Sequence, residues 1–78
     1  MEKRIKEVMA SVFSISELAI DDNTAAQTVE SWDSLNHMNL IIALEEEFGV
    51  EFDTKEIVSM VSYRSICLNI SKKLDKAL

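Results

Sequence analysis

The chain has 78 residues, of which 47% are hydrophobic, and a formal net charge of −6 at pH 7. This length predicts a single domain over residues 1–78, near the lower size limit for a core without disulfides or metal, and the hydrophobic fraction excludes a disordered chain. The negative charge argues against nucleic acid as a partner, because phosphates would be repelled, and favours basic protein surfaces.

Turn-forming residues are scarce, with one glycine and no proline, so the composition favours helices over an all-β chain. A single cysteine cannot form an internal disulfide and fits a reducing cytoplasm, where we expect the protein to reside. Lys6 and Glu7 interrupt any apolar run near the N-terminus, so no signal peptide is expected. No stretch approaches the ~20 apolar residues of a membrane span, so we expect no stable membrane insertion.

The segment from Met1 to about Phe13 predicts a first amphipathic helix. Its apolar residues recur at the spacing i, i+3, i+4 and i+7 that lines one helical face, at Ile5, Val8, Met9 and Val12.

The segment between Ser14 and Asp33 shows no sustained periodicity and predicts a loop that is long for so small a domain. An EF-hand calcium loop starting at Asp22 is excluded, because Gln27 stands where that motif needs glycine and Asp33 where it needs glutamate. The apolar residues expected to pin this loop to the helices are Ile15, Leu18, Ile20, Val29 and Trp32.

A second helix is predicted from about Ser34 to Phe48. Asp33 is a good N-cap, because its short carboxylate can accept hydrogen bonds from the N–H groups of the first turn. Gly49 provides the stop, because a residue without a Cβ enters the left-handed region easily.

This second helix has two apolar faces at about 100° per residue. The core-facing stripe contains Leu40, Ile41, Leu44 and Phe48, with His37 at its edge. A second stripe on roughly the opposite side contains Leu35, Met38 and Ile42, flanked by Glu45 and Glu46. The second stripe is either a docking face with an acidic margin or a surface buried by a neighbouring helix, and the wheel alone leaves both interpretations open.

Two further helices complete the prediction. A short one runs from Lys55 to about Met60 after a cap at Asp53 or Thr54, and a last one runs from a cap at Ser62 to about Lys76. The predicted fold class is all-α, a small four-helix bundle of three longer helices and one short helix, with a long loop between the first two.

The residues do not support catalysis by the chain itself. Ser34 and His37 are three positions apart on a helix, but the chain has one histidine and no glycine-rich turn or second loop for an oxyanion hole. Adjacent carboxylates such as Glu45 and Glu46 point apart on a helix, which argues against a glycosidase pair. One histidine and Cys67, which lies on the buried face of the last helix, give little support for a metal site, so we expect neither an enzyme nor a metalloprotein.

The chain resembles acyl carrier proteins over essentially its whole length. The resemblance rests on Asp33-Ser34-Leu35, then Leu40 and Ile41, then the run Ala43-Leu44-Glu45-Glu46-Glu47-Phe48-Gly49-Val50. It implies that a phosphopantetheinyl transferase, using coenzyme A and Mg²⁺, attaches a 4′-phosphopantetheine arm to Ser34. The arm would carry acyl groups as thioesters for enzymes of fatty-acid, polyketide or a related specialised pathway.

The resemblance also implies two further sets of site residues. Acyl-loading and acyl-consuming enzymes with basic patches would dock on Asp33, Leu35, Met38, Ile42, Glu45 and Glu46. An acyl pocket would be lined by His37, Ile41, Leu44, Ile57, Met60 and Ile66.

Several residues depart from the family pattern. Relatives of the fatty-acid synthesis type usually have acidic residues where this chain has Asn36 and Asn39, and glycine where it has Trp32. Trp32 and His37 occupy the N′ and N4 positions of a hydrophobic staple, which predicts a packed pair.

Ile57 and Ile66 are bulky where the family often has small residues. Our hypothesis is that the interior cleft is reduced, so that this carrier favours short or polar acyl groups and serves a specialised pathway. Two alternatives stay open: a carrier of aminoacyl or peptidyl groups, as in D-alanyl carriers, and an unmodified helical adaptor. A monomer is expected.

Overall fold

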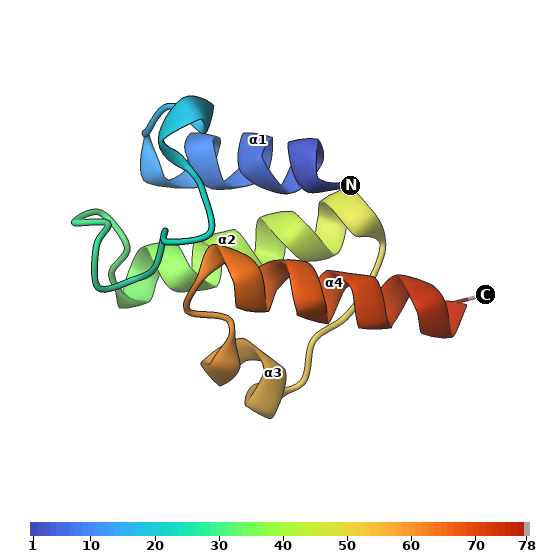
Figure 1. Ribbon diagram of the computed structural model, residues 1–78. Coiled ribbons are helices and arrows are strands. Elements are labelled where there is room, and N and C mark those ends of the chain that lie inside the picture. Colours follow the sequence, from blue (N-terminus) through green and yellow to red (C-terminus); the bar gives the residue numbers. More distant parts are fainter. Residues whose placement is uncertain (78) are drawn as a thin grey trace.

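The computed structural model describes residues 1–77, with side chains described as far as Asp75. The four helices are α1 (Glu2–Phe13), α2 (Ser34–Phe48), α3 (Thr54–Ser59) and α4 (Tyr63–Ala77), and a short 3₁₀ helix, η1 (Glu17–Ala19), lies between α1 and α2. Figure 1 shows α1, α2 and α4 running alongside one another, with the short α3 below them. The predicted all-α bundle of three longer helices and one short helix is confirmed.

Local capping explains the bounds of α2. Asp33 lies in extended conformation before the helix and its carboxylate accepts a hydrogen bond of 2.8 Å from the Asn36 N–H. At the other end Gly49 has a φ of 64°, in the left-handed region, and its N–H donates to the Glu45 carbonyl. The predicted span of Ser34 to Phe48 is confirmed, because both ends depend on residues next to them in the chain.

The short α3 begins and ends one residue earlier than predicted. Asp53 and Glu56 form a capping box, in which each side chain accepts a hydrogen bond from the other residue's N–H, so Thr54 is already helical. The Glu56 carboxylate also forms an ion pair of 2.8 Å with Lys73 on α4. This pair is only about one-fifth exposed, so it joins α3 to α4 at a partly desolvated position.

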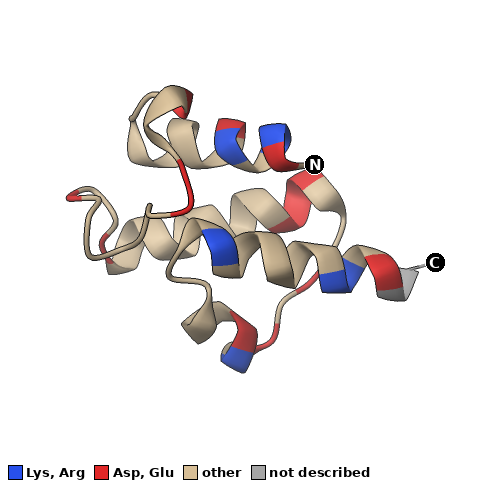
Figure 2. Cartoon of the chain, in the orientation of Figure 1, with Lys and Arg blue, Asp and Glu red and all other residues tan. Residues whose placement is uncertain are grey.

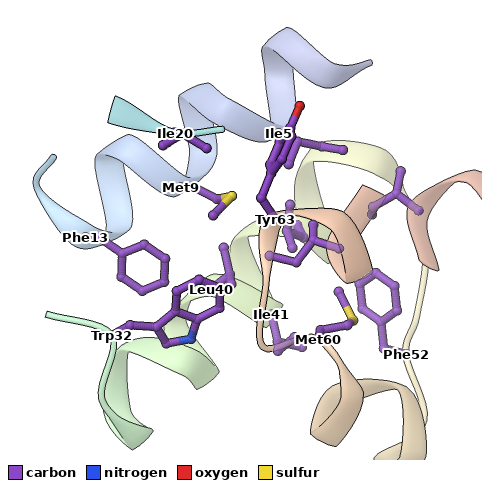
Figure 3. Packing of buried hydrophobic residues seen from close by; sticks show 13 residues of the cluster. Ile5, Met9, Phe13, Ile20, Trp32, Leu40, Ile41, Phe52, Met60 and Tyr63 are labelled. Atoms are coloured by element: carbon purple, nitrogen blue, oxygen red, sulfur yellow. The ribbon is translucent and has the colours of Figure 1, made fainter. Parts of the chain in front are cut away.

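The core lies between the three longer helices and receives side chains from each of them, from the long loop and from the segments on either side of α3, whose own Ile57 packs against it. Figure 3 shows Phe13 and Trp32 at one end of this core and Met60 and Phe52 at the other. The Phe13 and Trp32 rings stack with centroids 4.6 Å apart. The core side chains are Ile5, Met9, Phe13, Ile20, Trp32, Leu40, Ile41, Leu44, Phe52, Met60, Tyr63, Ile66 and Ile70.

The long loop is held mostly as predicted, with one error. Ile20 and Trp32 are buried, and Ile15 and Val29 pack against the core, but Leu18 is 97% exposed. Leu18 lies in η1, which is a single 3₁₀ turn. The N–H of Leu18 donates a hydrogen bond to the Ser16 hydroxyl, which caps this turn. A turn of three residues cannot direct all its side chains inward, so Leu18 points to solvent.

A short backbone pairing fixes the loop to the start of α4. Ala25 and Ser62 form an isolated antiparallel bridge, with hydrogen bonds of 2.9 Å from the Ala26 N–H to the Val61 carbonyl and from the Tyr63 N–H to the Thr24 carbonyl. Residues 1–77 contain no longer strand pairing than this bridge. The pairing gives the loop a defined position beside the N-terminus of α2.

The same substitution at two adjacent isoleucines tests which face of α2 lies in the core. Ile41 is 2% exposed and Ile42 is 51% exposed. Ile41→Val should lower the free energy of unfolding by about 0.5–1.5 kcal/mol, because it removes a buried methylene, whereas Ile42→Val should change it by less than about 0.5 kcal/mol. Urea unfolding of both variants measures this difference, and equal midpoints would contradict the assigned faces of α2.

Candidate functional site

Ser34 occupies the first helical position of α2 and is exposed to solvent. Its hydroxyl takes part in none of the side-chain hydrogen bonds among the described residues. Asp33, the N-cap immediately before it, is also exposed. The hydroxyl is therefore accessible to a modifying enzyme.

The backbone around Ser34 suits an anion. The Asp33 carboxylate already accepts the N–H of Asn36, and the Asp33 carbonyl accepts the N–H of His37 at 2.8 Å. Within the described chain, the N–H groups of Ser34 and Leu35 have no backbone or side-chain acceptor. Because these donors lie at the positive end of the helix dipole, a phosphodiester on the Ser34 oxygen would be stabilised there.

The second apolar stripe of α2 lies in solvent. Leu35 is 72% exposed, Met38 45% and Ile42 51%, so no element of the described chain buries this face. Figure 2 shows that α2 carries its acidic residues only toward its C-terminal end. Of the two interpretations left open by the helical wheel, burial by a neighbouring helix is therefore excluded, and a free apolar strip (Leu35, Met38, Ile42) next to Ser34 remains.

His37 connects three segments of the site. The Trp32 Nε1–H donates to His37 Nδ1 at 3.0 Å, and His37 Nε2 lies 2.8 Å from the Ile57 carbonyl oxygen at the end of α3. The indole nitrogen can only donate and a carbonyl oxygen can only accept, so this network assigns the neutral tautomer with the proton on Nε2. Both ring nitrogens are used, which leaves His37 unavailable as a base for Ser34.

The packed pair predicted at the staple positions is present, with the Trp32 and His37 rings stacked at a centroid distance of 6.2 Å. The hydrogen bond to Ile57 was not predicted. Ile57 lies twenty residues further along the chain, and no sequence pattern gives the distance between the end of one helix and the start of another.

A pocket of about 370 Å³ opens beside Ser34. Of the six residues predicted to line an acyl pocket, it includes only His37; the others in its lining are Ala26, Trp32, Asp33, Ser34, Met38 and Val61. Ile41, Leu44, Met60 and Ile66 are at most 2% exposed and Ile57 is partly buried, so these five belong to the core or pack against it. Ala26 and Val61 were missed because only the folded backbone brings them to α2.

Comparisons with known proteins agree with this geometry. Residues 3–68 match the family model described as the phosphopantetheine attachment site. The chain is 34% identical over 73 residues to the acyl carrier protein of Buchnera aphidicola subsp. Baizongia pistaciae (strain Bp), covering 94% of this chain and 92% of that protein.

The chain belongs to the acyl carrier protein family. Its fold matches the solution NMR structure of a holo acyl carrier protein from Geobacter metallireducens with a TM-score of 0.86, at 26% identity, covering 97% of this chain and 87% of the other. The cofactor of this carrier is covalent 4′-phosphopantetheine. The exposed hydroxyl and the unpaired N–H groups at the start of α2 fit such a phosphodiester-linked group.

Two of the three consecutive glutamates of α2 are bonded within the fold. The Glu45 carboxylate accepts the Phe52 N–H at 2.9 Å and so holds the chain after α2, and Glu47 forms an ion pair of 3.2 Å with Arg4. Glu46 is exposed, and it lines a groove between α1 and α2 together with Glu7 and Val8. Of the three consecutive glutamates, Glu46 is the one with no hydrogen bond or ion pair within the described chain.

Cys67 is a free cysteine on α4. It is partly buried against the core, and burial raises the pKa of its thiol, which reduces the thiolate fraction. Burial also raises the pKa of the neighbouring Tyr63 phenol, whose hydroxyl donates to Glu2 at 3.2 Å. Within the described residues, no three His, Cys, Asp or Glu side chains are grouped to hold a metal, and no helix is long and apolar enough to cross a membrane.

Proposed function

We propose that Ser34 carries the 4′-phosphopantetheine arm and that the protein delivers acyl groups, bound as thioesters to the arm, to partner enzymes. The observation that supports this most strongly is the exposed Ser34 hydroxyl at the capped N-terminus of α2, beside two N–H groups without acceptors. A phosphopantetheinyl transferase supplies the arm from coenzyme A. When bound, the arm provides the terminal thiol on which the thioester forms.

The carrier has no catalytic activity of its own in this proposal. The nucleophile candidate, Ser34, lacks an available base because both nitrogens of His37 are bonded to Trp32 and Ile57. General base catalysis requires a side chain within hydrogen-bond reach of the hydroxyl proton. The protein acts in the cytoplasm as a monomer, and its chemistry is performed by the enzymes that bind it.

Partner enzymes dock on the apolar strip (Leu35, Met38, Ile42), with the carboxylates of Asp33 and Glu46 at its margins. The strip supplies the apolar contact, whereas the two carboxylates mainly speed the encounter with basic patches and orient the partner. Asn36 and Asn39 are hydrogen-bonded to each other, and Asn36 also donates to the Ser31 carbonyl. These amides hold the loop at a place where an acidic residue would add charge.

The cargo is a short or polar acyl group, and the pathway is a specialised one. Ile41, Leu44, Met60 and Ile66 already fill the space between the helices. An acyl chain inserted there would have to displace packed side chains, which costs about 1–3 kcal/mol in a filled core. The His37 hydrogen bond to Ile57 also joins α2 to α3 at the end of α3, where an entrance would have to open.

An aminoacyl or peptidyl carrier is the second candidate. The acidic run Glu45-Glu46-Glu47 argues against it, since carriers of that type are typically less acidic, but Glu45 and Glu47 are bonded within the fold. Loading assays with acyl and aminoacyl donors distinguish the two candidates. The mass measurement described next distinguishes both carriers from an unmodified adaptor.

Replacing the serine should abolish modification. Incubation with coenzyme A, Mg²⁺ and a phosphopantetheinyl transferase should add the mass of one phosphopantetheine to the wild type and none to Ser34→Ala. Ser11→Ala is the matched control, because Ser11 is another exposed helical serine, and it should gain the same mass as the wild type. A mass gain in Ser34→Ala, or none in the wild type, contradicts the proposal.

Shortening an aliphatic side chain of the strip should weaken docking. Ile42→Ala should raise the KM of the transferase for the carrier by about tenfold with kcat nearly unchanged, because a buried interface contact of ~1.4 kcal/mol is lost. Leu68→Ala removes a comparably exposed aliphatic side chain on α4 and should leave KM unchanged. Initial rates of modification measure both, and an equal effect of the two substitutions would argue against a specific docking strip.

Thioester stability should depend on chain length. The holo protein is loaded with a series of acyl groups from acetyl to dodecanoyl, and the hydrolysis rate of each is compared with that of the same thioester on free phosphopantetheine. Long chains should be hydrolysed on the protein as fast as on free phosphopantetheine, because the core has no room for them. Equal protection of long and short chains would refute the cargo proposal.

A further inference from the structure

The pocket beside Ser34 is a candidate binding site that the docking strip and the core do not explain. Its lining combines the α2 residues Ser34 and Met38 with Trp32 from the loop end, and with Ala26 and Val61 from two other segments. Met38 is 45% exposed and Val61 47% exposed, so apolar surface remains open around it. A pocket that includes the modified serine is within reach of any group attached there.

The walls of this pocket are fixed before anything binds. The Ala26 N–H donates to the Val61 carbonyl at 2.9 Å, and the adjoining Ala25 and Ser62 form the antiparallel bridge. On the other side, Trp32 is held by its stack with Phe13 and its hydrogen bond to His37. A preformed site binds with little ordering of the protein, which favours even a weakly interacting group.

The chemistry of the lining selects among the parts of the arm. The lining contains no Lys or Arg, and its one carboxylate, Asp33, accepts the Asn36 N–H, so it offers no partner for the phosphate. The N–H groups of Ser34 and Leu35, which have no acceptor in the described chain, would hold the phosphate instead. The next part of the arm is the pantoyl group, a carbon bearing two methyl groups followed by a hydroxyl and an amide, and its apolar beginning matches Met38, Val61 and the edge of Trp32.

The volume of the pocket and the short link between Ser34 and the pantoyl group also favour this part of the arm. A volume of about 370 Å³ corresponds to roughly a dozen water-sized groups, enough for a branched segment of this kind but not for the whole arm with a long acyl chain. Because the pantoyl group is one phosphodiester away from Ser34, its effective concentration at the pocket is high and no free ligand has to be captured. The thiol end is held by a longer tether and is correspondingly less favoured.

We propose that this pocket binds the pantoyl part of the arm. This inference rests on attachment at Ser34, as given under Proposed function. The arm is then anchored at two points, its phosphate at the helix N-terminus and its two methyl groups in the pocket. Only the segment beyond them moves freely between partner enzymes.

The test uses uniformly ¹³C,¹⁵N-labelled holo protein carrying an unlabelled arm, with modification checked by intact mass. Isotope-filtered NOE spectra should connect the two pantoyl methyl groups to the Met38 methyl, the Val61 methyls and the Trp32 ring. The two methyl resonances should also shift from their positions in free pantetheine. Val61→Ser should remove these NOEs, whereas Val58→Ser, at a valine that is 68% exposed and outside the pocket, should retain them.

Each other outcome overturns the inference. A fully modified protein whose pantoyl methyls show no NOE to the protein, or whose NOEs come from the thiol end, removes the pocket assignment and leaves attachment at Ser34 intact. Retention of the NOEs in Val61→Ser places the arm elsewhere. An intact mass showing no modification removes both this inference and the proposed function.

Discussion

The arrangement of the site depends on the two hydrogen bonds of one imidazole ring. His37 accepts from the Trp32 indole and donates to the Ile57 carbonyl, so it joins the end of the long loop, the first turn of α2 and the end of α3. Trp32 in turn stacks on Phe13 at the end of α1. Through this one residue, the position of Ser34 is tied to three elements that are far apart in the sequence.

This constraint separates a rigid part of the molecule from a surface left free. The core is filled mainly by side chains from the three longer helices and the loop, and the loop is joined to the start of α4 by the Ala25–Ser62 bridge. The strip of Leu35, Met38 and Ile42 stays in solvent although its burial would contribute roughly 1.5–3 kcal/mol per side chain. A domain of this size has a free energy of unfolding of about 3–5 kcal/mol in total. Leaving the strip exposed therefore forgoes an amount of stability that is large compared with this total.

The helices were predictable because their ends depend on neighbouring residues. Asp33 and Gly49 define α2 through contacts within three or four positions, and the core stripe of α2 follows from its periodicity. The errors and omissions involve contacts that cross the chain. Leu18 was expected to pin the loop to the helices although a single 3₁₀ turn directs it outward, and the role of Val61 in the pocket depends on its pairing with the loop.

The acidic residues also form contacts that the sequence could not predict, because a charge pattern does not reveal which carboxylates are hydrogen-bonded or paired within the fold. Glu45 caps the Phe52 N–H and Glu47 pairs with Arg4, so the consecutive glutamates leave Glu46 facing solvent with no bonded partner in the described chain. Isolated exposed carboxylates contribute little energy at physiological salt. In the proposed docking, recognition therefore depends more on the shape of the apolar strip than on the net charge of −6.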